Sequence, residues 1–105
     1  MTATAVYGGK TVELDADGHL ARFEDWSEEL AVDIAKELGI AELTEDHWKV
    51  IRFMRKVYAE ERNVPTIRRL TTQSGVDTKR LYQLFPKGPL KKAAKIAGLP
   101  KPSSC

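Results

Sequence analysis

The stretch Thr44–Tyr58, TEDHWKVIRFMRKVY, decides the fold. Its apolar residues recur every three or four positions, which places them along one face of a helix. That apolar face consists of Trp48, Ile51, Met54, Val57 and Tyr58 and is widened by Val50 and Phe53. Acidic residues at the start favour the positive end of the helix dipole, and Pro65 ends the helical segment. The pattern therefore predicts one long helix at the centre of the core.

Upstream of this helix the sequence predicts a shorter helix and a hairpin. Ser27 is a good N-cap for a helix whose apolar residues have helical spacing, and Gly39 ends that helix in a left-handed conformation. Two short strands around Gly8-Gly9 make a β-hairpin over residues 6–12.

Downstream, two short helices form a helix-turn-helix pattern. They are expected at residues 67–74 and 78–85, with a sharp turn at Gly75. In a DNA-binding protein the second helix would offer Lys79, Arg80, Tyr82 and Gln83 to the major groove. Proteins that do not bind DNA use the same packing, and an acidic first half disfavours phosphate binding. DNA binding is therefore the weaker alternative.

A fifth helix begins at Pro89 and ends at Gly98, and two closely spaced prolines then favour an extended tail. The prediction is a mainly α fold, a small orthogonal bundle of about five helices with an N-terminal hairpin. Residues 1–98 would form the domain and residues 99–105 a mobile arm that carries Cys105.

The charge is divided along the chain. Residues 1–64 hold 8 Lys/Arg and 14 Asp/Glu, whereas residues 65–105 hold 9 Lys/Arg and only Asp77 as an acid. This division indicates a basic face for an anionic partner, or two halves that attract each other. No apolar run is long enough for a membrane span and no secretory signal precedes the hairpin, so we expect a cytoplasmic protein without membrane association.

The single cysteine, Cys105, excludes an internal disulfide and a cysteine-based metal cluster. The two histidines, His19 and His47, lie far apart and have no ligand partner at helical spacing, so they are read as structural or surface residues. No glycine-rich phosphate loop is present, and no cofactor is expected. An exposed thiol at the end of a tail can attack a persulfide, although an incidental terminal cysteine has the same appearance.

Several blocks of the sequence resemble the DsrC/TusE family of small sulfur-transfer proteins. The similar blocks are Asp25–Ser27, Leu43–Trp48, Pro65–Arg68, Leu81–Pro89 and Lys95–Pro102, followed by Cys105. The resemblance implies the helical fold above with a flexible C-terminal arm. It also implies that Cys105 carries a persulfide, received from a sulfur-donor protein and delivered to a sulfur-acceptor protein.

Members that serve dissimilatory sulfite reductase have a second cysteine eleven residues before the last one, and Ala94 stands there in this chain. The resemblance therefore favours single-cysteine, TusE-like members, which relay sulfur toward 2-thiouridine in tRNA. A gamma-subunit-like partner of sulfite reductase and a sulfur-responsive DNA-binding regulator remain alternatives. The basic residues at the root of the arm would steer an acidic partner or lower the pKa of the thiol. These residues are Lys87, Lys91, Lys92, Lys95 and Lys101.

Overall fold

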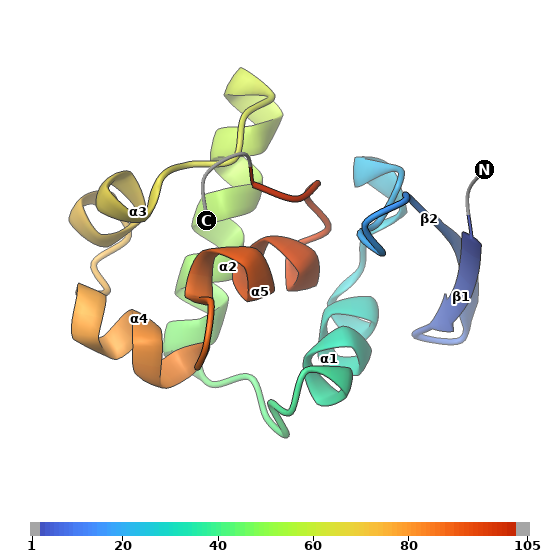
Figure 1. The fold of residues 1–105 in the computed structure, drawn as a ribbon, viewed down its shortest axis with the longest axis horizontal. Coiled ribbons are helices and arrows are strands. Elements are labelled where there is room, and N and C mark those ends of the chain that lie inside the picture. Colours follow the sequence, from blue (N-terminus) through green and yellow to red (C-terminus); the bar gives the residue numbers. More distant parts are fainter. Residues whose placement is uncertain (1–2, 103–105) are drawn as a thin grey trace.

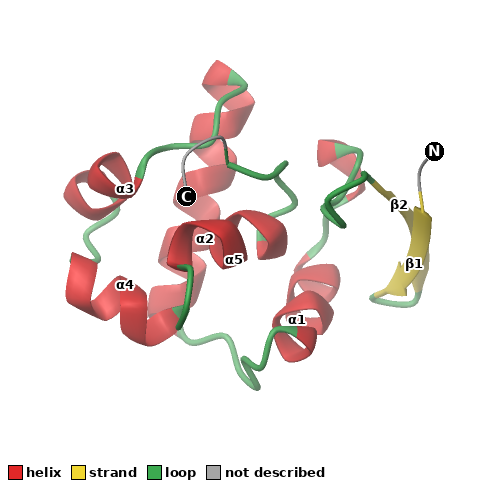
Figure 2. Ribbon diagram, viewed as in Figure 1, coloured by secondary structure: helices red, strands yellow, loops and turns green. Residues whose placement is uncertain are grey.

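The computed structural model describes residues 3–102 and shows a two-stranded hairpin followed by five helices (Figures 1 and 2). Cys105, the predicted carrier, lies outside the described residues. Within residues 3–102 no helix is long and apolar enough to cross a membrane. The elements are β1 Ala3–Tyr7, β2 Lys10–Leu14, a 3-10 turn Phe23–Asp25, α1 Glu28–Glu37, α2 Glu45–Glu61, α3 Ile67–Gln73, α4 Thr78–Leu84 and α5 Pro89–Ile96.

Local sequence signals set the helix ends. The side chain of Ser27 accepts a hydrogen bond from Leu30 N at the start of α1, and Asp77 accepts one from Arg80 N at the start of α4. Gly39 has a φ of +86°, a conformation that glycine adopts without steric cost, and follows the end of α1. These predicted boundaries are confirmed, and so is the fold class of five helices with an N-terminal hairpin.

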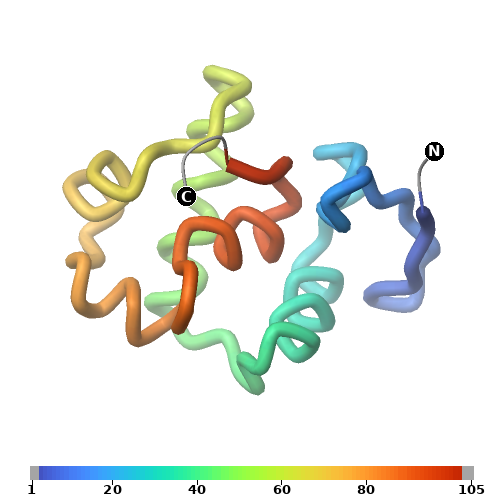
Figure 3. The backbone as a smooth tube through the Cα atoms, in the orientation of Figure 1, coloured from blue at the N-terminus to red at the C-terminus, as the bar shows by residue number. Residues whose placement is uncertain are grey.

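Helix α5 lies at the centre of the molecule and packs against α1, α2 and α4 (Figure 3). The predicted apolar face of α2 points into this core, where Ile51 and Met54 are fully buried. From α5, Ala93, Ala94 and Ile96 are also fully buried. Small side chains on α5 allow the surrounding helices to approach it closely, so that the helix lies inside the core although it is only eight residues long.

The hairpin is longer than the predicted residues 6–12 because its strands continue to Ala3 and Leu14. It lies against α1, where the backbone N–H of Gly8 donates to Oδ2 of Asp33 at 2.6 Å. A Cβ on Gly8 would lie only 2.9 Å from Cβ of Glu29, so glycine is needed for this close approach. The docking of the hairpin thus depends on its turn, which fits against the helix backbone.

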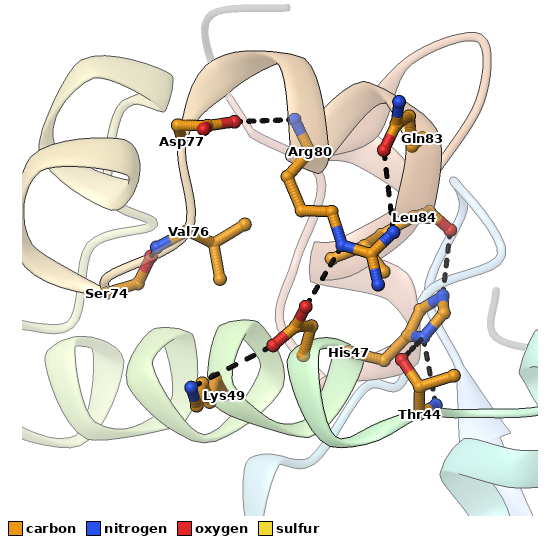
Figure 4. A network of polar contacts seen from close by, with 10 residues as sticks. Thr44, His47, Lys49, Ser74, Val76, Asp77, Arg80, Gln83 and Leu84 are labelled. Atoms are coloured by element: carbon orange, nitrogen blue, oxygen red, sulfur yellow. Dashed lines mark hydrogen bonds and ion pairs between the residues drawn. The ribbon is translucent and has the colours of Figure 1, made fainter.

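The helix-turn-helix element forms as predicted: α3 packs against α4, and Val76 and Leu81 are buried. On the outer side of α4, Tyr82 is half exposed. Nε of Arg80, however, donates to Asp46 of α2 at 3.0 Å (Figure 4). One of the side chains that the sequence offered for DNA reading is therefore used in an ion pair within the protein.

His47 joins the start of α2 to the end of α4 (Figure 4). Its Nδ1 accepts from Thr44 N at 2.9 Å, so the Nε2–H group donates to the carbonyl of Leu84, also at 2.9 Å. The ring is buried and packs edge-on against Phe85. Burial lowers the pKa of His47 below its usual value, and the nearby charge of Arg80 lowers it further.

We expect the free energy of unfolding to decrease as the pH falls from about 6.5, the usual pKa of histidine, toward 5. In this window the unfolded chain protonates His47 before the folded chain does, so acid favours unfolding. The loss cannot exceed about 1.4 kcal/mol per pH unit for this one group. Urea unfolding at several pH values checks this, with His47→Gln as the comparison. The variant should be less stable at neutral pH and should show a shallower pH dependence; an equally steep curve would assign the effect to another group.

Candidate functional site

The segment that leads to Cys105 starts from the end of α5, which is built as a Schellman motif. The N–H of Gly98 donates to Lys95 O at 3.2 Å, and the N–H of Leu99 donates to Ala94 O at 2.9 Å. Gly98 has the left-handed φ of +77° that this motif requires. Leu99 is the apolar residue that follows the glycine in such motifs, and it is fully buried.

Three side chains from distant parts of the chain hold the carbonyl groups of this helix end. The indole Nε1 of Trp26 donates to Ile96 O, and Nη1 of Arg55 donates to Ala97 O. The ring Nδ1 of His19 contacts Leu99 O, and all three distances are 2.9 Å. We call Trp26, Arg55 and His19 the carbonyl clamp. It satisfies carbonyl groups that a helix end leaves without partners and thereby fixes the direction in which the chain leaves α5.

Arg55 lies close to two aromatic rings. Its guanidinium carbon lies 3.9 Å from the ring centroid of Phe23 and 4.2 Å from that of Trp26. These distances allow cation–π attraction to both rings. Burial lowers the pKa of Arg55 to about 10, so the guanidinium is still protonated at neutral pH and keeps its donors. The stacking orients Arg55 toward the carbonyl of Ala97.

The clamp leaves no space for a side chain at residue 98. A Cβ on Gly98 would lie 2.7 Å from Cδ1 of Trp26, 3.1 Å from Leu20 and 3.2 Å from Nη1 of Arg55. Two of these three neighbours belong to the clamp and make hydrogen bonds of their own. Gly98 is thus required both by its backbone angle and by its surroundings.

The sequence predicts an arm that begins at Leu99. In the structure Leu99 is a core residue, Pro100 is half-buried and Pro102 is buried. Residues 99–102 therefore lie against the body of the protein, and the remaining residues, 103–105, lie outside the description. A mobile arm that carries Cys105 stays a prediction for those last three positions.

The structure gathers four of the five lysines named from the sequence. Lys87, Lys91, Lys92 and Lys95 line one cavity of about 300 Å³, on the turn before α5 and along α5 itself. Lys101 instead lines a separate hollow of about 320 Å³, together with Tyr58, Arg62, Asn63, Val64 and Pro100. The first four lysines thus form one basic cavity, while Lys101 belongs to the surface beside the chain's exit.

Sequence reasoning did not identify the clamp. The sequence predicts that His19 is a structural or surface residue, and the structure shows a fully buried ring that contacts the backbone 80 residues away. Trp26 and Arg55 bind carbonyls 70 and 42 residues away. The sequence gives no local signal for these contacts, because His19 and Trp26 stand among charged residues that are typical of an exposed turn. Such side-chain donors need a partner only once they are buried.

Comparisons with known proteins match nearly the whole chain. The family model described as "DsrC like protein" matches residues 6–105. Sulfurtransferase TusE of Escherichia coli O6:H1 is 46% identical over an alignment that covers 95% of this chain and 97% of the relative. The gamma subunit of the dissimilatory-type sulfite reductase of Nitratidesulfovibrio vulgaris is 42% identical, over an alignment that covers 98% of this chain and 98% of the relative.

Solved structures agree with these sequence matches. The NMR structure of DsrC from Allochromatium vinosum superposes with a TM-score of 0.85 at 39% identity, over 100% of this chain and 99% of that one. The crystal structure of the oxidised DsrC from Archaeoglobus fulgidus superposes with a TM-score of 0.81 at 38% identity, over 98% of this chain and 99% of that one. On its sequence and its fold together, the chain belongs to the DsrC-like family.

Proposed function

We propose that this protein is a sulfur carrier that holds a persulfide on Cys105. The observation that carries the proposal is the single cysteine at the end of a segment whose start is fixed by the carbonyl clamp. A thiol that follows such a fixed anchor closely in sequence can react with a partner while the body provides a defined surface for docking. Relatives named as a sulfurtransferase and as a sulfite reductase gamma subunit support the proposal.

The transfer conserves atoms and electrons. The thiolate of Cys105 attacks the outer sulfur of a persulfide on a donor protein, forming a new S–S bond as the donor's S–S bond breaks. The donor leaves as a thiolate, and Cys105 becomes the persulfide. A thiolate of the acceptor protein then attacks the outer sulfur, and Cys105 leaves as a thiolate. No metal or cofactor takes part in either step.

Because position 94 is alanine, Cys105 has no second thiol in its own chain. The carrier therefore cannot release its sulfur through an internal disulfide, and each delivery needs an acceptor thiol from another protein. This supports a place in a TusE-like relay toward 2-thiouridine in tRNA. The chain is 46% identical to TusE and 42% identical to the gamma subunit. These values are too close to distinguish a role in tRNA thiolation from a role as a partner of sulfite reductase.

Partners are expected to be acidic around their active sites. The lysines on and before α5 put a positive field on the body, and such a field accelerates association with an oppositely charged protein. Lys101, which is exposed, adds charge beside the chain's exit. In this proposal the lysines act on docking, whereas Cys105 performs the chemistry.

Incubation with a cysteine-desulfurase-type persulfide donor tests the proposal. Intact-protein mass spectrometry should show a gain of about 32 Da, the mass of one sulfur atom, and peptide mapping should place it on Cys105. The gain should disappear on treatment with a thiol reductant. Absence of the adduct with a donor that loads another carrier in the same experiment would contradict the proposal.

A further inference from the structure

The basic cavity is closed on one side by a turn of the N-terminal half. Besides its four lysines it is lined by Asp17, His19, Leu38 and Gly88. A Cβ on Gly18 would lie 3.8 Å from Nζ of Lys95, so this ammonium group extends over the turn that carries Asp17 and His19. Four lysines and one aspartate thus contribute to the lining of this small hollow.

These charges are not neutralised within the described part of the chain. None of the five ion pairs among residues 3–102 uses a lysine of the cavity. Lys91 and Lys95 are four residues apart on α5, and Lys92 and Lys95 are three apart, so they repel one another along the helix. An anion between them would relieve this repulsion.

The start of α5 adds to the positive potential. Gly88 precedes the helix and offers no side chain to bind its free N–H groups, whereas α1, α3 and α4 are capped by Ser27, Thr66 and Asp77. No acidic residue lies in the first turn of α5. The positive end of the helix dipole therefore lies beside the cavity without a counter-charge.

His19 supplies an independent observation. Its Nε2 is the only buried side-chain nitrogen or oxygen without a hydrogen-bond partner within residues 3–102. Nδ1 faces the carbonyl of Leu99, which can only accept, so Nδ1 carries the proton and Nε2 of the neutral ring presents a lone pair. A ligand that satisfies this atom has to donate a hydrogen bond, and the four lysines that line the same cavity favour a negatively charged ligand.

We propose that the cavity binds a small protonated oxyanion of the hydrogen phosphate class. Its oxygens accept hydrogen bonds from the lysine ammonium groups, and its O–H group donates to Nε2 of His19. At about 300 Å³ the cavity is at the small end of ligand sites, which suits an inorganic anion. The proposal does not depend on the chemistry of Cys105. Bound anion would also reduce the positive field that attracts acidic partners.

Titration of the 15N-labelled full chain with sodium phosphate and with sodium sulfate, at constant low ionic strength and near-neutral pH, tests this. Phosphate should give saturable shifts at the amides of Gly18, Gly88 and Lys91, and the ring Nε2 resonance of His19 should move. Sulfate carries no proton at this pH, so it should bind about 5-fold more weakly, the effect of one hydrogen bond. Lys91→Gln/Lys95→Gln should lower phosphate affinity about 10-fold or more.

The matched control is Lys56→Gln/Lys79→Gln, which removes two exposed helical lysines outside the cavity and changes the net charge equally. It should leave phosphate affinity within about 2-fold, because exposed charges at a distance are screened. Equal affinities for phosphate and sulfate, shifts that do not saturate, or equal losses in the two double variants would overturn the proposal. A further result would also overturn it: the protein binds neither phosphate nor sulfate, yet sulfur transfer is lost in Lys91→Gln/Lys95→Gln. The two lysines would then serve a protein partner alone.

Discussion

Replacement of Cys105 with serine is expected to abolish sulfur transfer, a loss of about 100-fold or more, because a serine hydroxyl is a poor nucleophile at neutral pH. The variant should fold normally, since within residues 3–102 the core of buried apolar side chains extends from Tyr7 to Leu99 and forms without Cys105. Its free energy of unfolding should change by less than about 0.5 kcal/mol. The measurement is the rate at which 35S moves from a loaded donor to an acceptor protein.

Ser104→Ala is the matched control, because it alters the neighbouring residue and keeps the thiol. It should transfer sulfur at close to the wild-type rate. The Cys105→Ser variant also separates a carrier from a scaffold. A non-catalytic subunit should still co-purify with its complex and support its activity without the thiol, whereas a carrier should not. Wild-type transfer rates in Cys105→Ser would therefore contradict the carrier role.

Gly98→Ala should destabilise the protein strongly, because it adds a side chain to a residue that is both left-handed and crowded. The left-handed backbone costs a residue with a Cβ about 1–2 kcal/mol, and overpacking adds about 1–3 kcal/mol. Trp26 and Arg55 cannot move aside without breaking their hydrogen bonds to Ile96 and Ala97. We expect about 3 kcal/mol in total, which lowers the melting temperature by roughly 12 °C or more in a domain of this size. Thermal unfolding followed by circular dichroism measures it.

Gly39→Ala provides the matched comparison. Gly39 also follows a helix in a Schellman motif and has a φ of +86°, but a Cβ there would meet no atom within 4 Å. Its loss should be the backbone cost alone, about 1–2 kcal/mol. The difference between the two variants isolates the contact with the clamp. Similar losses in both would mean that Trp26 and Arg55 give way easily and do not fix the helix end.

Much of the fold follows from local sequence signals. The spacing of apolar residues in residues 44–58 predicted α2, and Ser27, Gly39 and Asp77 set helix ends through interactions with residues only three to five positions away. The hairpin was predicted too short, because the outer parts of its strands are largely exposed and lack a clear apolar alternation. Signals of this kind depend on residues a few positions apart, so they are visible in the sequence itself.

The site was only partly predictable, because it depends on contacts between residues that lie far apart in the sequence. The sequence predicts that the basic residues lie at the root of the arm, but the turn around His19 that lines the cavity with four of them comes from the other end of the chain. The clamp joins His19, Trp26 and Arg55 to one helix end, and no sequence pattern encodes contacts across such separations. Leu99 illustrates the difference: beside two prolines it looks like the start of a tail, yet packing makes it part of the core.

The burial of Pro102 sets a geometric limit on the proposed carrier. Cys105 is three residues beyond Pro102, and an extended chain spans at most about 3.5 Å per residue. If the proposed carrier delivers sulfur from Cys105, its backbone can reach at most about 10 Å from Pro102. One residue inserted between Pro102 and Cys105 would add about 3.5 Å to this limit. The spacing between these two residues would thus set the depth of the acceptor pocket that the proposed carrier can serve.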